Sequence, residues 1–123
     1  MAARSNGAPL TSTTRDSWER VFDINVTACY VLAREAAKPM IEAGWGRIIN
    51  IGSYVSVIGR ERLASYVASK HAIAGLTKSI AGELGRHGIT PATRSRPGFS
   101  IRIWRHRPCA IRNARKYSAA PSQ

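Results

Sequence analysis

Apolar residues recur at helical spacing over the first third of the chain. Between residues 16 and 43, apolar side chains return every three or four positions, which predicts a helix with one face turned to a core. Thr13 or Thr14 can cap its start, and Gly44 can end it. Pro39 lies late in the segment and is expected to kink the helix or to end it early. The predicted inward face consists of Trp18, Val21, Asn25, Cys29, Leu32 and Ala36.

A short strand and a second helix follow. Residues 47–53 hold three isoleucines bounded by glycines, which predicts a parallel strand covered on both faces. Residues 54–63 have no period and are expected to form a loop. Residues 64–86 predict the second helix, and a further strand would begin at Ile89. One helix face is core-like (Ile73, Leu76, Ile80, Leu84), and another carries small residues that permit close packing (Ala68, Ala72, Gly75, Ser79, Gly82).

The order helix, buried parallel strand, helix predicts the α/β class. A complete doubly wound sheet of six strands needs roughly 200 residues, so the 123 residues are expected to form only part of a parallel sheet. Beyond Thr90 no hydrophobic period is visible, because arginines and prolines interrupt every apolar stripe. We therefore divide the chain into an α/β segment, residues 1–90, and an irregular or disordered basic tail, residues 91–123.

Charge separates the same two parts. The chain has 19 Lys and Arg against 7 Asp and Glu, for a net charge of +12, and residues 91–123 supply +8 of it without a single acidic residue. Two cysteines, Cys29 and Cys109, are too few for a disulfide framework, and no Cys/His cluster has the spacing of a metal site. No signal-peptide core and no membrane-length apolar run is present. We expect a soluble cytoplasmic protein without a metal.

Four side chains are candidates for acid–base chemistry or for its support. Tyr66 and Lys70 are four residues apart on a predicted helix and therefore share a face. An ammonium beside a phenol favours the phenolate, which can exchange a proton with an alcohol or a carbonyl. Ser53 lies at the carboxyl end of the predicted strand, where open α/β sheets bind ligands. Asn25 is the one polar residue in the inward stripe of the first helix, and each of these signals is weak when taken alone.

Taken together, these residues resemble the short-chain dehydrogenase/reductase family. The order Asn25, Ser53, Tyr66, Lys70 occurs with steps of 28, 13 and 4 residues, within the segments WERVFDINV, GRIINIGS and YVASK. The following AIAGLTKSIAGELGRHGI is also similar to the family, and the resemblance covers roughly residues 9–90. Within the family, the sequence resembles both 3-oxoacyl-acyl-carrier-protein reductases and sugar-acid or polyol dehydrogenases. The resemblance therefore does not decide between these substrate classes.

The resemblance implies a role for each residue and a partial Rossmann-type sheet. Tyr66 would be the general acid/base, and Lys70 would favour its phenolate and bind the nicotinamide ribose. Ser53 would bind and orient the substrate oxygen, and Asn25 would locally break its helix so that its carbonyl holds a water in a proton relay. The implied reaction is reversible hydride transfer between NAD or NADP and a small alcohol or ketone. The implied partners are copies of the same chain, with no membrane.

The sequence departs from the family pattern at two places. The Gly-rich turn that holds the cofactor pyrophosphate is absent from the 123 residues, so the isolated chain is expected to be inactive. The genetic code allows residues 91–105 to be compared with a shifted reading frame, in which each codon is built from the third base of one codon and the first two bases of the next. The codons for Pro91 to Arg105 permit the residues C-N-A-I-S-P-G-L-L-D-T-D-M-A in this frame. That series resembles the family's continuation. We therefore expect the tail to be the product of a frameshift and the chain to be a fragment.

Two other functions remain open. The arginines near Trp104, His106 and Tyr117 could bind nucleic acid through phosphate contacts and stacking, although the frameshift explains the tail without a ligand. Alternatively, the chain could be a passive fragment whose two long helices pair with an intact relative.

Overall fold

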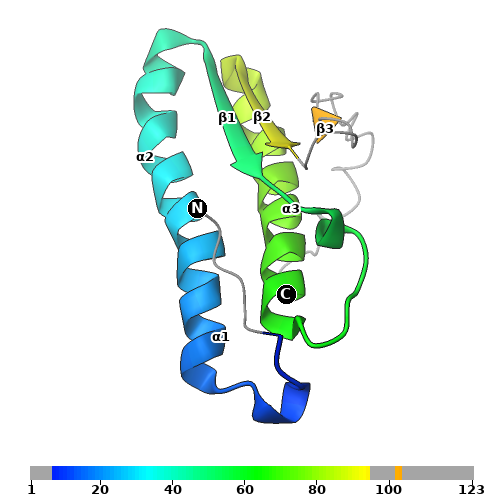
Figure 1. Cartoon of the computed structure of the whole chain (residues 1–123). Helices are drawn as coiled ribbons and strands as arrows, with labels where there is room; N and C mark the ends of the chain where they lie inside the picture. The colour runs from blue at the N-terminus through cyan, green and yellow to red at the C-terminus, as the bar shows by residue number, and fades with distance from the viewer. Residues whose placement is uncertain (1–6, 95–101, 104–123) are drawn as a thin grey trace, which may run out of the picture.

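The structure is a computed structural model that describes residues 7–94 and 102–103. Figure 1 shows helices and a small sheet within this part of the chain. The α-helices are α1 (Arg15–Phe22), α2 (Ala28–Ala43) and α3 (Ala64–Leu84), and the strands are β1 (Gly46–Ile51), β2 (Ile89–Arg94) and β3 (Arg102–Ile103). A π-helical turn, Asp23–Thr27, joins α1 to α2, and 3-10 turns span Leu10–Ser12, Tyr54–Ser56 and Gly85–His87.

The first predicted helix forms, but a π-helical turn divides it into α1 and α2. The hydroxyl of Thr14 accepts the backbone N–H of Ser17 at 3.2 Å, which makes Thr14 the cap at its start. The helix continues through Pro39 to Ala43, so the expected early end is wrong. Pro39 and Glu35 are both exposed, so water can satisfy the Glu35 carbonyl that would otherwise bond to residue 39.

The predicted inward face of this helix is correct at Val21 and Asn25 and wrong at Trp18, which is 37% exposed, and on α2. On α2 the buried side chains are Ala33 and Ala37, whereas Leu32 is 70% exposed. A π-turn closes its hydrogen bonds over five residues instead of four, so it uses more residues per turn than an α-helix. The inward positions therefore advance in steps of four across the turn, which the regular three-and-four spacing could not predict.

The helix α3 begins at Ala64 and ends at Leu84, close to its predicted bounds. Ile73 and Leu84 are buried as expected. The stripe of small residues lies outward, since added Cβ atoms at Gly75 and Gly82 would meet nothing within 4 Å. The loop predicted before α3 is irregular apart from the 3-10 turn at its start.

The strands form one sheet in the order β1-β2-β3 within the described residues. β1 and β2 are parallel, with Gly46 opposite Ile89 and Ile51 opposite Arg94, and β3 pairs antiparallel to β2. β2 therefore continues to Arg94, four residues past the point where the hydrophobic period is lost. Its Pro91 is fully buried.

Both long helices cover the same face of the sheet (Figure 1). The core between them and the sheet consists of Ala33 and Ala37 from α2, Leu84 from α3, Ile48 from β1 and Ile89 from β2. The opposite face of β1 is open, with Ile49 58% and Ile51 62% exposed. The expectation that this strand is covered on both faces is wrong for the described residues, because none of them packs over that face.

Two left-handed glycines lie against each other at the amino end of the sheet. Gly44 ends α2 with φ +66°, and Gly88 precedes β2 with φ +75°. A Cβ added at Gly88 would collide with the backbone carbonyl oxygen of Gly44. This pair of turns therefore needs glycine at residue 88 both for its backbone conformation and for the close approach.

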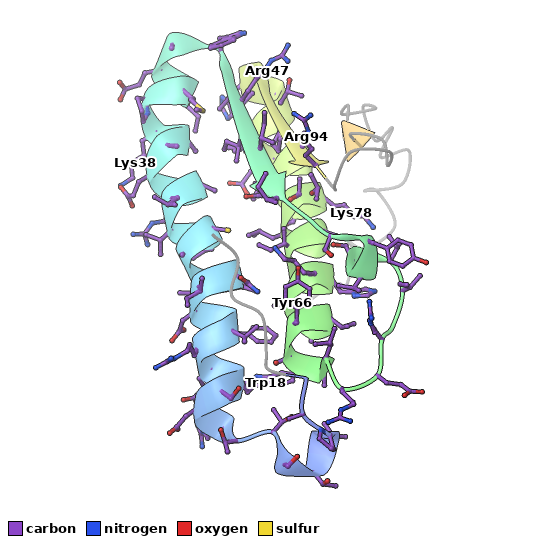
Figure 2. The ribbon with its side chains drawn as sticks, viewed as in Figure 1. Trp18, Lys38, Arg47, Tyr66, Lys78 and Arg94 are labelled. Atoms are coloured by element: carbon purple, nitrogen blue, oxygen red, sulfur yellow. The ribbon has the colours of Figure 1, made fainter. Side chains whose placement is uncertain are left out.

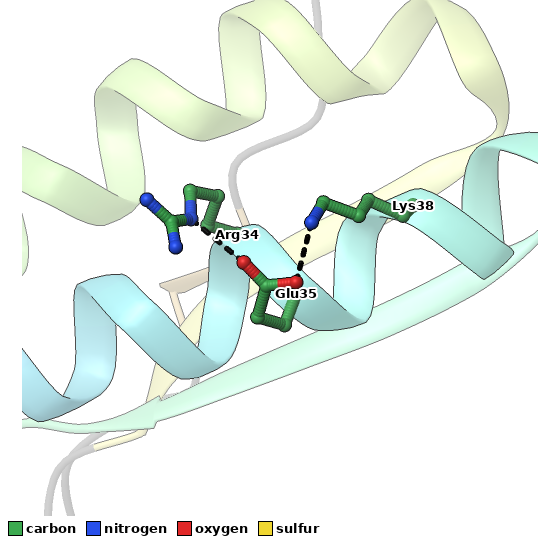
Figure 3. A network of polar contacts seen from close by, with 3 residues as sticks. All are labelled: Arg34, Glu35 and Lys38. Atoms are coloured by element: carbon green, nitrogen blue, oxygen red, sulfur yellow. Dashed lines mark hydrogen bonds and ion pairs between the residues drawn. The ribbon is translucent and has the colours of Figure 1, made fainter.

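The outer surface of α2 carries a small ionic network (Figure 3). Glu35 accepts from Arg34 Nε at 2.8 Å and from Lys38 Nζ at 2.5 Å. These cations, Lys38 first and Arg34 second, lower the pKa of the Glu35 carboxyl. All three side chains are solvent-exposed, so the network lies on the outer surface of the helix and does not attach the helix to the core.

The predicted α/β class, a partial parallel sheet with helices, is confirmed. The predicted irregular tail lies mostly outside the described residues, which include only 91–94 and 102–103 of it. No helix in the described part of the chain combines the length and the apolar character that crossing a membrane requires.

Candidate active site

The carboxyl end of β1 is the place where the predicted site residues gather. Gly52 extends the ladder by one residue, because its N–H donates to the Arg94 carbonyl at 2.8 Å. Ser53 then leaves the sheet, and its backbone N–H donates to Ser56 Oγ at 3.0 Å. Ser53 remains half-buried next to the strand end. Its position confirms the expectation that it lies at the carboxyl end of the strand, and a second serine, Ser56, holds the turn around it.

Lys70 connects α3 to this strand end. The residue is only 3% exposed, and its Nζ donates to the carbonyl of Ile51 at 2.8 Å. Its Nζ also lies 5.8 Å from the centroid of the Tyr66 ring, the arrangement expected from their four-residue spacing. A buried ammonium requires such partners. Because an ammonium has three N–H donors, two remain beyond the Ile51 bond.

Tyr66 is half-buried on the first turns of α3. Figure 2 shows it projecting from α3 below the end of β1 in this view. Lys70 Nζ lies over the Tyr66 ring, 5.8 Å from its centroid, which is a cation–π contact. The structure therefore brings a phenol and an ammonium together at the end of β1.

Asn25 contacts the same helix from the π-helical turn. It is 3% exposed within the π-helical turn, and its Nδ2 donates to Ser69 Oγ at 3.1 Å. Ser69 Oγ in turn donates to the backbone carbonyl of Tyr66 at 2.8 Å. The helix is thus locally distorted at Asn25, as the family resemblance implied. Hydrogen bonds link Asn25 to the turn that carries Tyr66, and Lys70 directly follows Ser69.

Sequence reasoning missed the polar residues on the inner face of α3. Ser65, Ser69, Ile73 and Thr77 recur every four residues, and each is at most 1% exposed. Thr77 Oγ1 accepts from Asn50 Nδ2 of β1 at 3.0 Å and donates to the carbonyl of Ile73 at 2.8 Å. The recurrence of serine, isoleucine and threonine every four residues indicates this buried face in the sequence. The pattern is ambiguous, because small polar residues are also common on exposed helix faces.

A family comparison and two sets of relatives bear on this site. The family model described as short chain dehydrogenase matches residues 1–99. This match extends beyond residues 9–90, which carry the resemblance in the sequence.

Curated relatives are oxidoreductases. The chain is 41% identical over 108 residues to an uncharacterized oxidoreductase, YgcW, from Escherichia coli, covering 76% of this chain and 41% of that protein. It is 45% identical over 84 residues to the 3-oxoacyl-[acyl-carrier-protein] reductase FabG from Rickettsia conorii, covering 68% of this chain and 34% of that protein. The chain therefore spans well under half the length of these relatives.

Solved structures of similar fold include enzymes crystallised with dinucleotides. A gluconate 5-dehydrogenase from Burkholderia cenocepacia, in complex with NADP and tartrate, matches with a TM-score of 0.71 and 32% identity over 77% of this chain and 36% of that one. A 4-hydroxyisoleucine dehydrogenase mutant complexed with NADH and succinate matches with a TM-score of 0.74 and 36% identity, over 77% and 39%.

Proposed function

The chain belongs to the short-chain dehydrogenase family, and from this membership we propose that it carries the proton-transfer half of an NAD(P)-dependent oxidoreductase site. The substrate class is a small alcohol or the corresponding ketone. The observation that supports the proposal is the buried Lys70, whose Nζ bonds the end of β1 and faces the Tyr66 ring. This contact fixes a cation and a phenol at the carboxyl end of a parallel strand, where such sheets bind ligands.

The described residues fit one end of a dinucleotide and not the other. The two remaining N–H donors of Lys70 suit the hydroxyls of a ribose. A pyrophosphate needs a glycine turn at a helix N-terminus. Among the described residues, glycines with positive φ are Gly7, Gly44 and Gly88, and the last two lie at the opposite, amino end of the sheet. Residues 7–94 therefore contain no cradle for the phosphates.

Each protein group has a defined task in the proposed reaction. Bound NAD or NADP would accept or return the hydride at the substrate carbon. Tyr66 takes the hydroxyl proton as the alcohol is oxidised and returns it in the reverse direction. Lys70 stabilises the phenolate and binds the ribose, and Ser53 donates a hydrogen bond to the substrate oxygen as charge develops on it. Asn25, anchored through Ser69, holds the π-turn whose backbone carbonyl binds a relay water.

The wider setting of the site is part of the same proposal. Self-association through α2 and α3 is supported by their exposed outer faces, which include Tyr30 and Val31 on α2 and the open glycines of α3. A cytoplasmic location is supported by the free, half-buried thiol of Cys29, which suits a reducing compartment.

A chimera tests the site without requiring the absent phosphate cradle. Residues 7–94 would replace the matching segment of the Rickettsia conorii reductase. We expect the chimera to oxidise or reduce substrate, and Tyr66→Phe to lower kcat by about a hundredfold or more with NADPH binding retained. Tyr30→Phe, which removes the hydroxyl of an exposed tyrosine on α2, is the matched control and should leave kcat unchanged.

Two results would contradict the proposal. A Tyr66→Phe chimera that kept more than about a tenth of the parent kcat would exclude Tyr66 as the acid/base. Measurable NADPH binding or turnover by the unaltered 123-residue chain would show that a phosphate cradle is not needed, contrary to the fit described above.

A further inference from the structure

Ser69 lies where the π-turn packs against α3. Figure 1 shows the first helical segment and α3 side by side, and the π-turn Asp23–Thr27 contacts α3. Ser69 is completely buried in this contact, at 0% exposure. Its hydroxyl accepts from Asn25 Nδ2 at 3.1 Å and donates to the Tyr66 carbonyl at 2.8 Å. One small side chain therefore joins the turn that carries Asn25 to the turn that carries Tyr66.

The direction of these two hydrogen bonds fixes the amide of Asn25. A hydroxyl has one proton to donate, and the carbonyl of Tyr66, which can only accept, takes it. Ser69 can therefore only accept from Asn25, so the amide must present its NH2 group and not its oxygen. The orientation of a side chain in the π-turn is thus determined by a backbone carbonyl of α3.

The same hydroxyl supports the first turns of α3. This helix begins without a side-chain cap, because the residue at its N-cap is Leu63. Helix geometry directs the backbone N–H of Lys70 to the Tyr66 carbonyl, four positions earlier. This carbonyl therefore receives the Ser69 hydroxyl in addition to its helical bond. The added bond holds the turn that bears both Tyr66 and Lys70.

Two other hydroxyls on the inner face of α3 show what is particular to Ser69. Ser65, one turn earlier, is also buried, but its Oγ has no hydrogen-bond partner in the described part of the chain. Thr77, two turns later, is buried and repeats the bonding pattern of Ser69. Its Oγ1 accepts from Asn50 Nδ2 and donates to the Ile73 carbonyl. Of these three hydroxyls, only that of Ser69 bonds to candidate site residues.

We propose that Ser69 is a positioning residue for proton transfer, an inference that rests on the proposed function. Its hydroxyl keeps the π-turn, whose carbonyl would bind the relay water, at a fixed separation from the turn of Tyr66. Because Ser69 is completely buried against Asn25, it contacts neither substrate nor cofactor itself. Loss of the hydroxyl should slow proton transfer and leave NADPH binding intact, since the Lys70 bond to the Ile51 carbonyl remains.

Kinetics of the chimera test the effect on proton transfer. Ser69→Ala should lower kcat about tenfold, the factor expected for one lost hydrogen bond, with an unchanged Kd for NADPH. The solvent deuterium isotope effect on kcat should rise, because proton transfer then limits the rate more strongly. A variant that merely folds less well has fewer active molecules and the isotope effect of the parent. Ser69→Thr keeps a hydroxyl that can bond the carbonyl three residues earlier and should restore the parent isotope effect.

Two controls on the same face of α3 separate this effect from general loss of a buried hydroxyl. Ser65→Ala makes the same substitution one turn away, at a hydroxyl without a partner, and should leave kcat unchanged. Thr77→Val removes a hydroxyl with the same two kinds of bond. It should lower the urea midpoint as Ser69→Ala does and change neither the isotope effect nor kcat.

Hydrogen exchange in the full 123-residue chain tests the contact without activity. The N–H of Ala28 closes the π-turn by bonding to the Asp23 carbonyl. Ser69→Ala should speed exchange of the Ala28 amide about tenfold relative to Thr77→Val, because only the first variant releases the π-turn from α3.

Three outcomes would overturn the inference. A parent-like isotope effect in Ser69→Ala would mean that the residue is structural only. An equal loss of kcat in Thr77→Val would mean that any buried hydroxyl on this face has the same effect. Equal exchange of the Ala28 amide in both variants would remove the link to the π-turn. An active Tyr66→Phe chimera would instead contradict the proposed function, and exchange at Ala28 would still decide whether Ser69 holds the π-turn.

Discussion

Lys70 has a structural contact in the fold and a chemical role in the proposed reaction. Its burial beneath the end of β1 is tolerated because the Ile51 carbonyl accepts a hydrogen bond at 2.8 Å and the Tyr66 ring lies 5.8 Å away. In the proposed reaction the same ammonium would bind the ribose and stabilise the phenolate. Removing the charge therefore alters the strand end and the chemistry together.

We predict that Lys70→Met lowers both stability and activity of the chimera. The Ile51 carbonyl would lose its charged donor, which costs about 1–3 kcal/mol when an acceptor is left buried without a partner. We also expect a loss in kcat and weaker NADPH binding, since the phenolate and the ribose lose the same cation. Urea unfolding and steady-state kinetics measure the two effects.

Lys78→Met is the control for Lys70→Met, because Lys78 is an exposed lysine of the same helix. It should change neither kcat nor the unfolding midpoint appreciably. Unchanged stability in Lys70→Met would mean that the bond to Ile51 contributes nothing to the strand end.

At this scale the positions of the four candidate residues on their elements could be predicted from sequence, but their hydrogen-bond partners could not. Tyr66 and Lys70 share a helix face by simple periodicity, and Ser53 lies at the end of a recognisable strand. The bond from Asn25 to Ser69 joins residues 44 positions apart, across two elements. No local pattern specifies such a pairing, so Ser69 became visible only when α3 was packed against the π-turn.

Among the elements, the helix divided by the π-turn shows where periodicity fails. Both ends and the cap at Thr14 follow from local rules, whereas the turn changes which side of α2 faces the sheet. β1 was also identified correctly, but its alternating buried and exposed residues contradict cover on both faces. A run of isoleucines indicates that both faces of a strand are apolar. It does not specify whether helices cover one face or both.

The turns at Gly44 and Gly88, at the amino end of the sheet, predict different costs in stability for different glycine substitutions. Gly88→Ala should destabilise the chimera by about 1–3 kcal/mol or more, from its positive φ together with the collision with Gly44. Gly44→Ala, which has the φ strain alone, should cost about 1 kcal/mol. Gly75→Ala, in open space on α3, should stabilise by about 0.5–1 kcal/mol. Urea unfolding measures the series, and a Gly88→Ala cost no larger than that of Gly44→Ala would refute the close contact.

The ionic network on α2 should contribute little to the stability of the fold, and only at pH values above the acidic range. The pKa of Glu35 is lowered from its ordinary value of 4.5, so its carboxylate contributes stability at higher pH, and the contribution is lost as the pH falls through the lowered pKa. We predict that Glu35→Gln shifts the thermal midpoint slightly at pH 7 and not at all at pH 2 or in molar salt. A large shift at pH 7 that persists in salt would contradict this assignment.

For the whole molecule, the gene tests the boundary between the family-like part of the chain and its basic tail. The family model matches residues 1–99, and β2 reaches Arg94. We nevertheless predict a shift in reading frame near the Thr90 codon, because the charge changes abruptly there and family-like residues can be recovered from the neighbouring frame. Sequencing the DNA should show Asn-Ala-Ile, Pro-Gly, Thr and Met in the shifted frame.

The opposite result is equally clear. The shifted frame could contain a stop codon within a few codons of Arg94, or it could encode a sequence unlike the family. Either result would show that residues 91–123 are translated in their correct frame. The eight basic residues of this tail would then call for an acidic partner, and a salt-dependent shift of DNA by residues 91–123 would be the first measurement.

The proline in β2 has a consequence for the length of the ladder beside it. Alternation from Gly52 places the missing N–H of Pro91 on the side away from β1, the side that meets β3. In the described residues β3 pairs there with Ala92 and Thr93. A longer ladder would lose one hydrogen bond at Pro91, because proline has no N–H to donate. Pro91 thus sets a length limit for the pairing of β2 with β3.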